Sequence, residues 1–113
     1  MTVQTGKLAE QAAAEYLVRS GYMVIARNWR TKACEIDIVA CKDSCMHFVE
    51  VKYRASSTQG TGLEYVTPAK LRRMAFAAGQ WVRANNWEGE VNLAAVEVAA
   101  PDYTITDFIE SIY

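Results

Sequence analysis

Helical spacing and strand-like runs of apolar residues alternate along this chain of 113 residues. Residues 6–20 carry alanine, leucine and tyrosine at helical spacing, and Gly21 is suited to end a helix there. Residues 22–30, 33–41 and 45–54 are rich in β-branched and aromatic residues, which favour strands. The first half of the chain is therefore predicted to form one helix followed by three strands.

The second half of the chain repeats the change from helix to strand. Thr67 and Pro68 are a typical start of a helix, which we predict over residues 69–86. Its predicted apolar side consists of Leu71, Met74, Ala75, Ala78 and Val82. Residues 90–100 form a predicted fourth strand, and residues 103–113 are a fifth strand or an irregular tail. The order αβββαβ predicts the α/β class, with a mixed central sheet flanked by helices.

Length and composition are those of an ordinary globular protein, with 51% hydrophobic and 22% charged residues. We expect one domain over residues 1–113. No apolar run is long enough to span a membrane and the N-terminus lacks an apolar signal region, so we expect a cytoplasmic protein without a membrane partner. The 3 cysteines include no CxxC pair, which favours reduced thiols.

Charged residues interrupt the apolar strands of the predicted hairpin: Glu35, Asp37, Glu50 and Lys52. If the hairpin turn is centred on residues 43–44, Asp37 lies opposite Glu50 on the same face of the sheet. Two opposed carboxylates repel each other unless a positive charge lies between them. A register shifted by one residue would instead place them on opposite faces.

A divalent cation, Mg²⁺ or Mn²⁺, would remove this repulsion. Asp37, Glu50 and the backbone carbonyl of Val51 are its candidate ligands, with Glu10 from the edge of the first helix as a further one. Lys52 could then activate water or neutralise charge on a phosphate, as a catalytic residue beside the two acids. The alternative is an ordinary half-exposed strand with a cross-strand ion pair.

The net charge of −1 does not indicate nucleic-acid binding, but the charges are unevenly distributed. All 12 lysines and arginines lie at or before Arg83, and residues 84–113 hold six acidic residues and no basic one. A basic binding face and an ordinary mixed surface with an acidic tail fit this pattern equally well. The candidate contacts to a nucleic-acid backbone are Arg27, Arg30, Lys32, Arg54, Lys70, Arg72 and Arg73.

Several motifs of the chain resemble those of a known family. Five segments resemble, in the same order, the motifs of the YraN family of bacterial proteins. They are "GKLAEQAAAEYLVRSGY", "RNWR", "EIDIVA", "FVEVKYR" and "VTPAKLRRMAFAA". Asp37 followed by Glu50-Val51-Lys52 resembles the PD-(D/E)xK nuclease superfamily, which has a restriction-endonuclease-like fold. The resemblance implies that Asp37, Glu50 and Lys52 are metal and catalytic residues, and that Glu10 is the helix carboxylate of resolvase-like members.

The expected function is that of a metal-dependent nuclease that hydrolyses DNA phosphodiester bonds, including branched, otherwise structured or single-stranded DNA. Two alternatives stay open: a non-catalytic module that binds nucleic acid, and an adaptor whose acidic C-terminal segment docks a basic protein partner. The sequence also permits a homodimer. Because fold analogy does not establish function, the nuclease, the binding module and the adaptor stay separate hypotheses.

Overall fold

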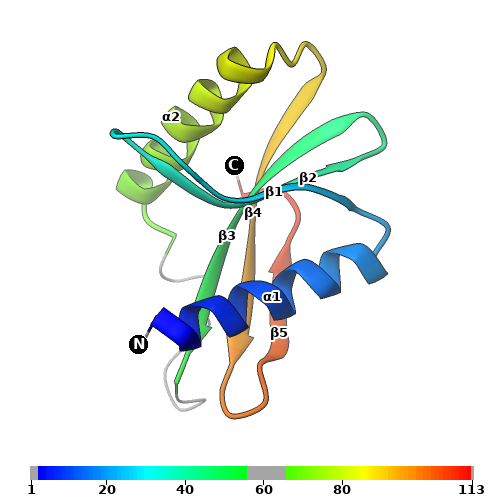
Figure 1. Cartoon of the computed structure of the whole chain (residues 1–113), viewed down its shortest axis with the longest axis vertical. Coiled ribbons are helices and arrows are strands. Elements are labelled where there is room, and N and C mark those ends of the chain that lie inside the picture. Colours follow the sequence, from blue (N-terminus) through cyan, green and yellow to red (C-terminus); the bar gives the residue numbers. More distant parts are fainter. Residues whose placement is uncertain (1–2, 56–65, 113) are drawn as a thin grey trace.

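The computed structural model describes residues 3–55 and 66–112, in which two helices and five strands are found (Figure 1). All elements predicted from the sequence are present, and the C-terminal segment forms a strand instead of an irregular tail. Residues 56–65, between the third strand and the second helix, lie outside the described residues. The elements are α1 (Val3–Arg19), β1 (Met23–Arg30), β2 (Glu35–Lys42), β3 (Cys45–Arg54), α2 (Pro68–Asn85), β4 (Glu90–Ala99) and β5 (Thr104–Ile109).

The strands form one mixed sheet in the order β1-β2-β3-β4-β5. β3 and β4 are parallel, and the other neighbouring pairs are antiparallel. A parallel pair needs a crossover connection, and α2 supplies it between β3 and β4. The predicted α/β class and mixed sheet are thus confirmed.

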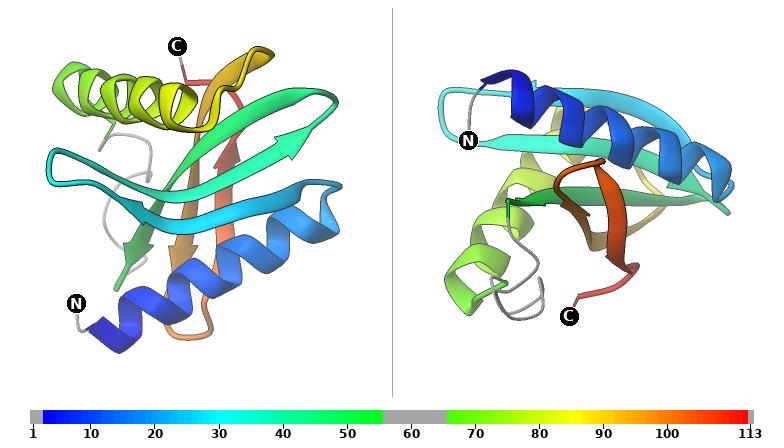
Figure 2. Two further views of the ribbon diagram at one scale, coloured as in Figure 1. Left: turned by 45° about the horizontal axis from the view of Figure 1, so that its top comes forward. Right: turned by 90° about the horizontal axis from the view of Figure 1, so that it is seen from below.

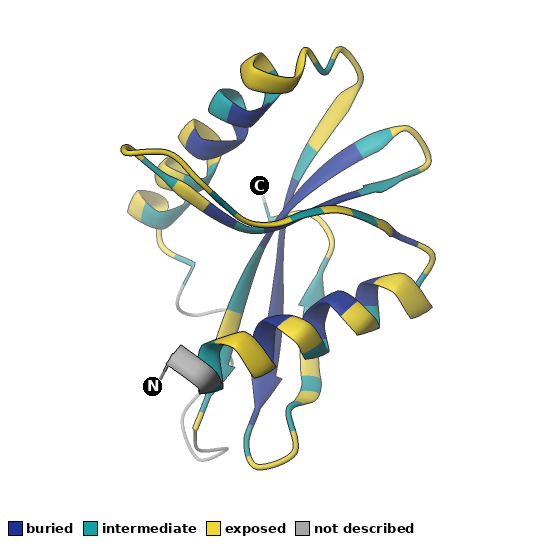
Figure 3. Cartoon of the chain, in the orientation of Figure 1, coloured by how far each residue is buried: buried dark blue, intermediate teal, exposed yellow. Residues whose placement is uncertain are grey.

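The two helices cover opposite faces of the sheet (Figure 2). On the α1 face, Leu17 packs with Ile38, Val49 and Val96. On the other face, Trp81 of α2 meets Phe48 edge to face, with 5.6 Å between ring centroids. Buried residues run along β4 and lie on the sides of α1 and α2 that face the sheet (Figure 3).

The prediction for the buried side of α2 was partly wrong. Leu71, Met74, Ala75, Ala78 and Val82 were expected to face the core. Ala75 is exposed, whereas Ala77 and Trp81 are buried with Ala78. The large Trp81 side chain packs on Phe48, and this contact sets the rotation of the helix.

Backbone signals at the helix ends work as expected. Gly21 has φ +94°, and the amide of Tyr22 donates to the carbonyl of Leu17, which closes α1 in a Schellman arrangement. The Thr67 side chain accepts a hydrogen bond of 3.1 Å from the Lys70 amide and caps α2.

The register of the β2–β3 hairpin is the predicted one. Asp43 and Ser44 form a two-residue turn in which both residues have positive φ, and the paired residues run from Lys42–Cys45 to Ile38–Val49. Beyond Ile38 the pairing ends, and β1 and β2 curve toward α2 while β3 continues in its own direction (Figures 1 and 2). This separation of β2 from β3 is where Asp37 and Glu50 lie.

Candidate functional site

Asp37 occupies the point where β2 leaves β3. Its Oδ2 accepts a hydrogen bond of 2.8 Å from the backbone amide of Val51, in place of the β2 carbonyl that a continued ladder would offer. Burial raises the pKa of Asp37 to about 7, and the nearby Glu50 charge adds to this rise. The Val51 hydrogen bond only partly offsets both effects. The site therefore favours either a proton on Asp37 or an added cation beside it.

Glu50 lies on β3 next to the start of α2. Lys70, in the first turn of α2, forms an ion pair with it, with 2.5 Å between Nζ and Oε2. Lys70 was expected to contact nucleic acid, and the structure instead brings it to a predicted metal ligand. Glu50 keeps 23% of its side-chain surface exposed, so the pair still meets solvent.

Glu10 is the third carboxylate near this point. It is 8% exposed, and its Oε1 lies 3.9 Å from Nε of Arg27 without a hydrogen bond. Burial raises the pKa of Glu10, and Arg27 and Arg30 partly oppose this effect. The charge of Glu10 also contributes to the raised pKa of Asp37. The sequence placed Glu10 at the edge of the apolar face of α1, and its burial there is a new finding.

The remaining parts of the predicted motif lie on either side of Glu50. Lys52 is exposed, two positions along the strand and therefore on the same face as Glu50. In a strand, the N–H and C=O groups of one residue point to the same side. Because the Val51 amide donates to Asp37, the Val51 carbonyl also points to the side on which Asp37 lies.

A groove runs beside Glu50 between α2 and the connection from β1 to β2. We refer to it as the α2 groove; it has a volume of about 820 Å³. At the end of the groove formed by the β1–β2 connection, Nε of Arg30 lies 3.5 Å from Oε2 of Glu35. Lys32 is exposed in the same connection. The residues that line the groove are Ala33, Cys34, Glu35, Glu50, Ala69, Lys70, Arg72, Arg73, Met74 and Phe76.

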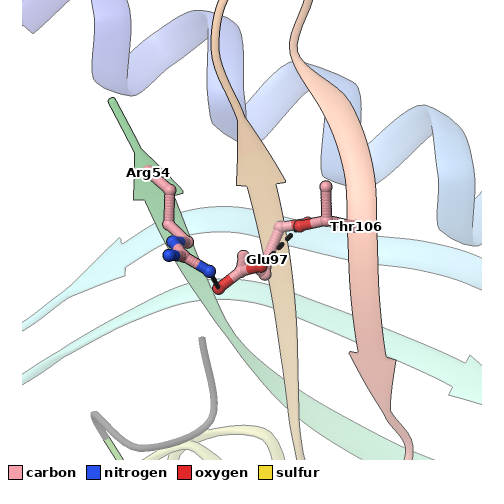
Figure 4. A network of polar contacts seen from close by, with 3 residues as sticks. All are labelled: Arg54, Glu97 and Thr106. Atoms are coloured by element: carbon pink, nitrogen blue, oxygen red, sulfur yellow. Dashed lines mark hydrogen bonds and ion pairs between the residues drawn. The ribbon is translucent and has the colours of Figure 1, made fainter. Parts of the chain in front are cut away.

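Arg54 does not reach this groove. Its Nη1 lies 3.4 Å from Oε2 of Glu97 on β4, and Oε1 of Glu97 accepts a hydrogen bond of 2.5 Å from Thr106 on β5 (Figure 4). Only 12% of the Arg54 side chain is exposed. The guanidinium is therefore largely covered and paired with Glu97, and its contact with a phosphate stays a prediction. The sequence analysis missed Glu97, although a lone acid in the apolar run of residues 93–99 was the available signal.

Two further observations concern the described residues only. No group of three or more His, Cys, Asp or Glu side chains in them is close enough to hold a metal ion. Neither described helix is long and apolar enough to cross a membrane. Cys34, Cys41 and Cys45 are not joined by a disulfide in this structure.

The fold and the site define a class: an α/β protein whose five-stranded mixed sheet is covered by one helix on each face, with a cluster of carboxylates where two strands part. The chain belongs to the Uncharacterised protein family UPF0102, whose model matches residues 9–106. This result confirms the resemblance to the YraN family.

Relatives from several bacteria support the assignment. A UPF0102 protein of Cytophaga hutchinsonii is 33% identical over 103 residues, which cover 91% of each chain. One of Kineococcus radiotolerans is 39% identical over 99 residues, covering 86% of this chain and 81% of the relative. One of Oleidesulfovibrio alaskensis is 41% identical over 87 residues, or 76% of this chain but 43% of the longer relative.

Proposed function

We propose that this protein is a metal-dependent nuclease that hydrolyses DNA phosphodiester bonds, with the restriction-endonuclease-like fold of the PD-(D/E)xK superfamily. The observation that carries the proposal is the placement of Asp37. Its carboxylate is fixed by the Val51 amide beside Glu50, at a position where burial and repulsion raise its pKa to about 7. Strongly perturbed groups beside a groove are typical of functional sites.

The residues present fit Mg²⁺ or Mn²⁺. Asp37, Glu50 and the Val51 carbonyl offer hard oxygen atoms. Glu10 has a buried oxygen without a hydrogen bond, but in this structure it is not close enough to both other carboxylates to complete one ligand set. Mg²⁺ is often held by one or two carboxylates together with water and substrate phosphates, so a complete cage of protein ligands is not required. When bound, such a cation polarises a phosphate oxygen and acidifies water.

The protein's own residues would contribute position and charge. Asp37, held by the Val51 amide, keeps a fixed direction toward the substrate. Lys52 would place its ammonium near the phosphate and stabilise charge that develops there. Lys70 forms an ion pair with Glu50. If Lys70 instead binds a phosphate in the same groove, the Glu50 carboxylate is released to bind a cation.

Basic residues on both walls of the α2 groove would hold the DNA backbone. Arg72 and Arg73 lie on α2, and Arg30 and Lys32 lie near the facing end of β1. Such contacts position a duplex or strand without reading its sequence. Arg27, which pairs with Glu10, would support the site from the α1 face.

The test is cleavage of supercoiled plasmid, single-stranded DNA and branched DNA in Mg²⁺ and in Mn²⁺. We expect the wild-type protein to cut at least one of them, and Asp37→Ala and Lys52→Ala to lose this activity. Asp43→Asn is the matched control, since Asp43 is exposed in the turn that follows β2 and lies outside the α2 groove. Equal cutting by all four proteins would assign the activity to another site or to a contaminant.

One observation favours a second candidate, a module that binds nucleic acid or a protein partner without turnover. The Lys70–Glu50 ion pair already neutralises one of the proposed ligands. Salt-dependent DNA binding that needs no metal and leads to no cleavage would support this candidate. A homodimer and a cytoplasmic location are further predictions from the sequence. Light scattering would measure the oligomeric state.

A further inference from the structure

Phe76 is an aromatic side chain on the wall of the α2 groove that the core does not use. Half of its surface is exposed, at 50%. The residues that α2 buries against the sheet are Ala77, Ala78 and Trp81. Single exposed apolar residues are common on protein surfaces, so the exposure alone indicates no function. Its surroundings are what distinguish Phe76.

Two arginines adjoin Phe76 on the helix surface. Arg72 lies four residues before it and Arg73 three residues before it, the two spacings that place side chains next to each other on a helix. Both arginines are exposed and line the α2 groove together with Phe76. Lys70 adds a third cation to the same wall. An aromatic ring thus stands among positive charges that suit phosphate groups.

Proteins that bind single-stranded nucleic acid combine a positive groove with aromatic rings on which bases stack. Inside a duplex, both faces of each base are covered by neighbouring bases. A ring at the groove wall can therefore stack only on a base that is unpaired or has left the duplex. Glu50 lines this groove, so the unpaired nucleotide would lie near the proposed cleavage position.

We infer that Phe76 stacks on an unpaired base while Arg72 and Arg73 hold the adjoining phosphates, so that the site selects DNA with unpaired nucleotides. This inference rests on the proposed function, because it uses the same groove. It adds a residue that determines specificity and a substrate class to that function.

The test measures binding in the absence of divalent metal, by fluorescence anisotropy, for a single-stranded oligonucleotide and for a blunt duplex of the same length. We expect Phe76→Ala to weaken binding of the single strand by about 5- to 150-fold, which is the range for loss of one stacked base. Duplex binding should change less than twofold. Phe76→Trp should keep the preference, since a larger ring also stacks. Val18→Ala is the control, because Val18 is 57% exposed on α1, at the opposite face.

A 2-aminopurine base in the single strand reports stacking directly, since its fluorescence should fall on binding to the wild-type protein and not to Phe76→Ala. Equal affinity of wild type and Phe76→Ala for the single strand would overturn the inference, even where cleavage depends on Asp37. Conversely, stacking that depends on Phe76 without any cleavage would remove the proposed nuclease function and keep the stacking site. Absence of DNA binding by the wild-type protein would overturn both.

Discussion

Each end of β3 carries a cluster of polar groups that are wholly or partly buried, and the two clusters differ in how far their hydrogen bonds are satisfied. Near the start of the strand, Asn92 places its Nδ2 at 3.4 Å from Nδ1 of His47 and also donates to the carbonyl of Glu110. The Tyr22 hydroxyl donates to the Glu110 carboxylate, and its ring meets the His47 ring at 5.0 Å. These contacts join the C-terminal segment to the sheet.

At the other end, Asp37 and Glu10 are buried with too few partners. Asp37 accepts one backbone hydrogen bond, and an oxygen of Glu10 accepts none. Their pKa values are raised mainly by burial, which means that their charged forms destabilise the fold. A cluster that satisfies itself stabilises the structure, whereas one that costs folding free energy marks a functional site.

The largest effect is expected on catalysis. Asp37→Asn keeps the size of the side chain and an oxygen for the Val51 amide, but it removes the negative charge. We expect metal-dependent cleavage to fall at least about 100-fold, because the lost charge is the one that would hold the cation. Initial rates on the preferred DNA measure this. Asp43→Asn should retain activity within about threefold, because Asp43 is exposed and lies outside the α2 groove, and an equally inactive Asp43→Asn would show that net charge alone is responsible.

A substitution at the other end of β3 should destabilise the protein. Asn92→Ala leaves Nδ1 of His47 and the carbonyl of Glu110 without their shared donor. We expect a loss of about 1–3 kcal/mol in the free energy of unfolding, measured in urea. Asn85→Ala is the control, since the exposed Asn85 only donates back to Trp81 within α2. Equal stability of Asn92→Ala and wild type would mean that water replaces these contacts without cost.

Asp37→Asn should increase the free energy of unfolding when metal is chelated, whereas Asn92→Ala should decrease it. The folded-state pKa of Asp37 is about 7, above the unfolded value of about 3.9. Between these values the folded protein holds a proton that the unfolded chain has released, so stability falls as the pH rises. At pH 8, Asp37→Asn should therefore be more stable than wild type by about 1–3 kcal/mol, and at pH 4 the gain should vanish. Urea unfolding in EDTA measures both, and a destabilised variant at pH 8 would show that Asp37 is structural.

Much of the fold follows from local signals in the sequence. Gly21, Thr67 and the Asp43-Ser44 turn each set a backbone geometry, and the turn fixed the register that brings Asp37 toward Glu50. These signals act between near neighbours, which makes them readable without a structure. The motif around Glu50 was readable for the same reason.

Contacts between distant elements could not be predicted in this way. Lys70 meets Glu50 only because α2 crosses the sheet, and Arg54 meets Glu97 only because β3 and β4 are parallel neighbours. Trp81 of α2 packs on Phe48 of β3, a contact that the spacing of apolar residues within α2 did not indicate. Charge and spacing predicted a phosphate contact for Arg54 but gave no sign of its partner Glu97 on the neighbouring strand.

The smallest expected effect concerns His47 and is best measured in the Asp37→Asn background. Burial lowers the pKa of His47, an effect that the Glu110 charge opposes and the Lys42 charge adds to. The unfolded chain then takes up a proton, near pH 6.5, before the folded protein does, so stability should fall as the pH drops below that value. Asp37 in the wild type has the opposite slope over the same range and would hide this decrease, which is why its substitution is needed. His47→Gln in that background should flatten the curve between pH 7 and 5. An unchanged slope would show that the pH dependence of stability comes from a group outside the cluster of Tyr22, His47, Asn92 and Glu110. The two ends of β3 would then not differ in the way that their stability depends on pH.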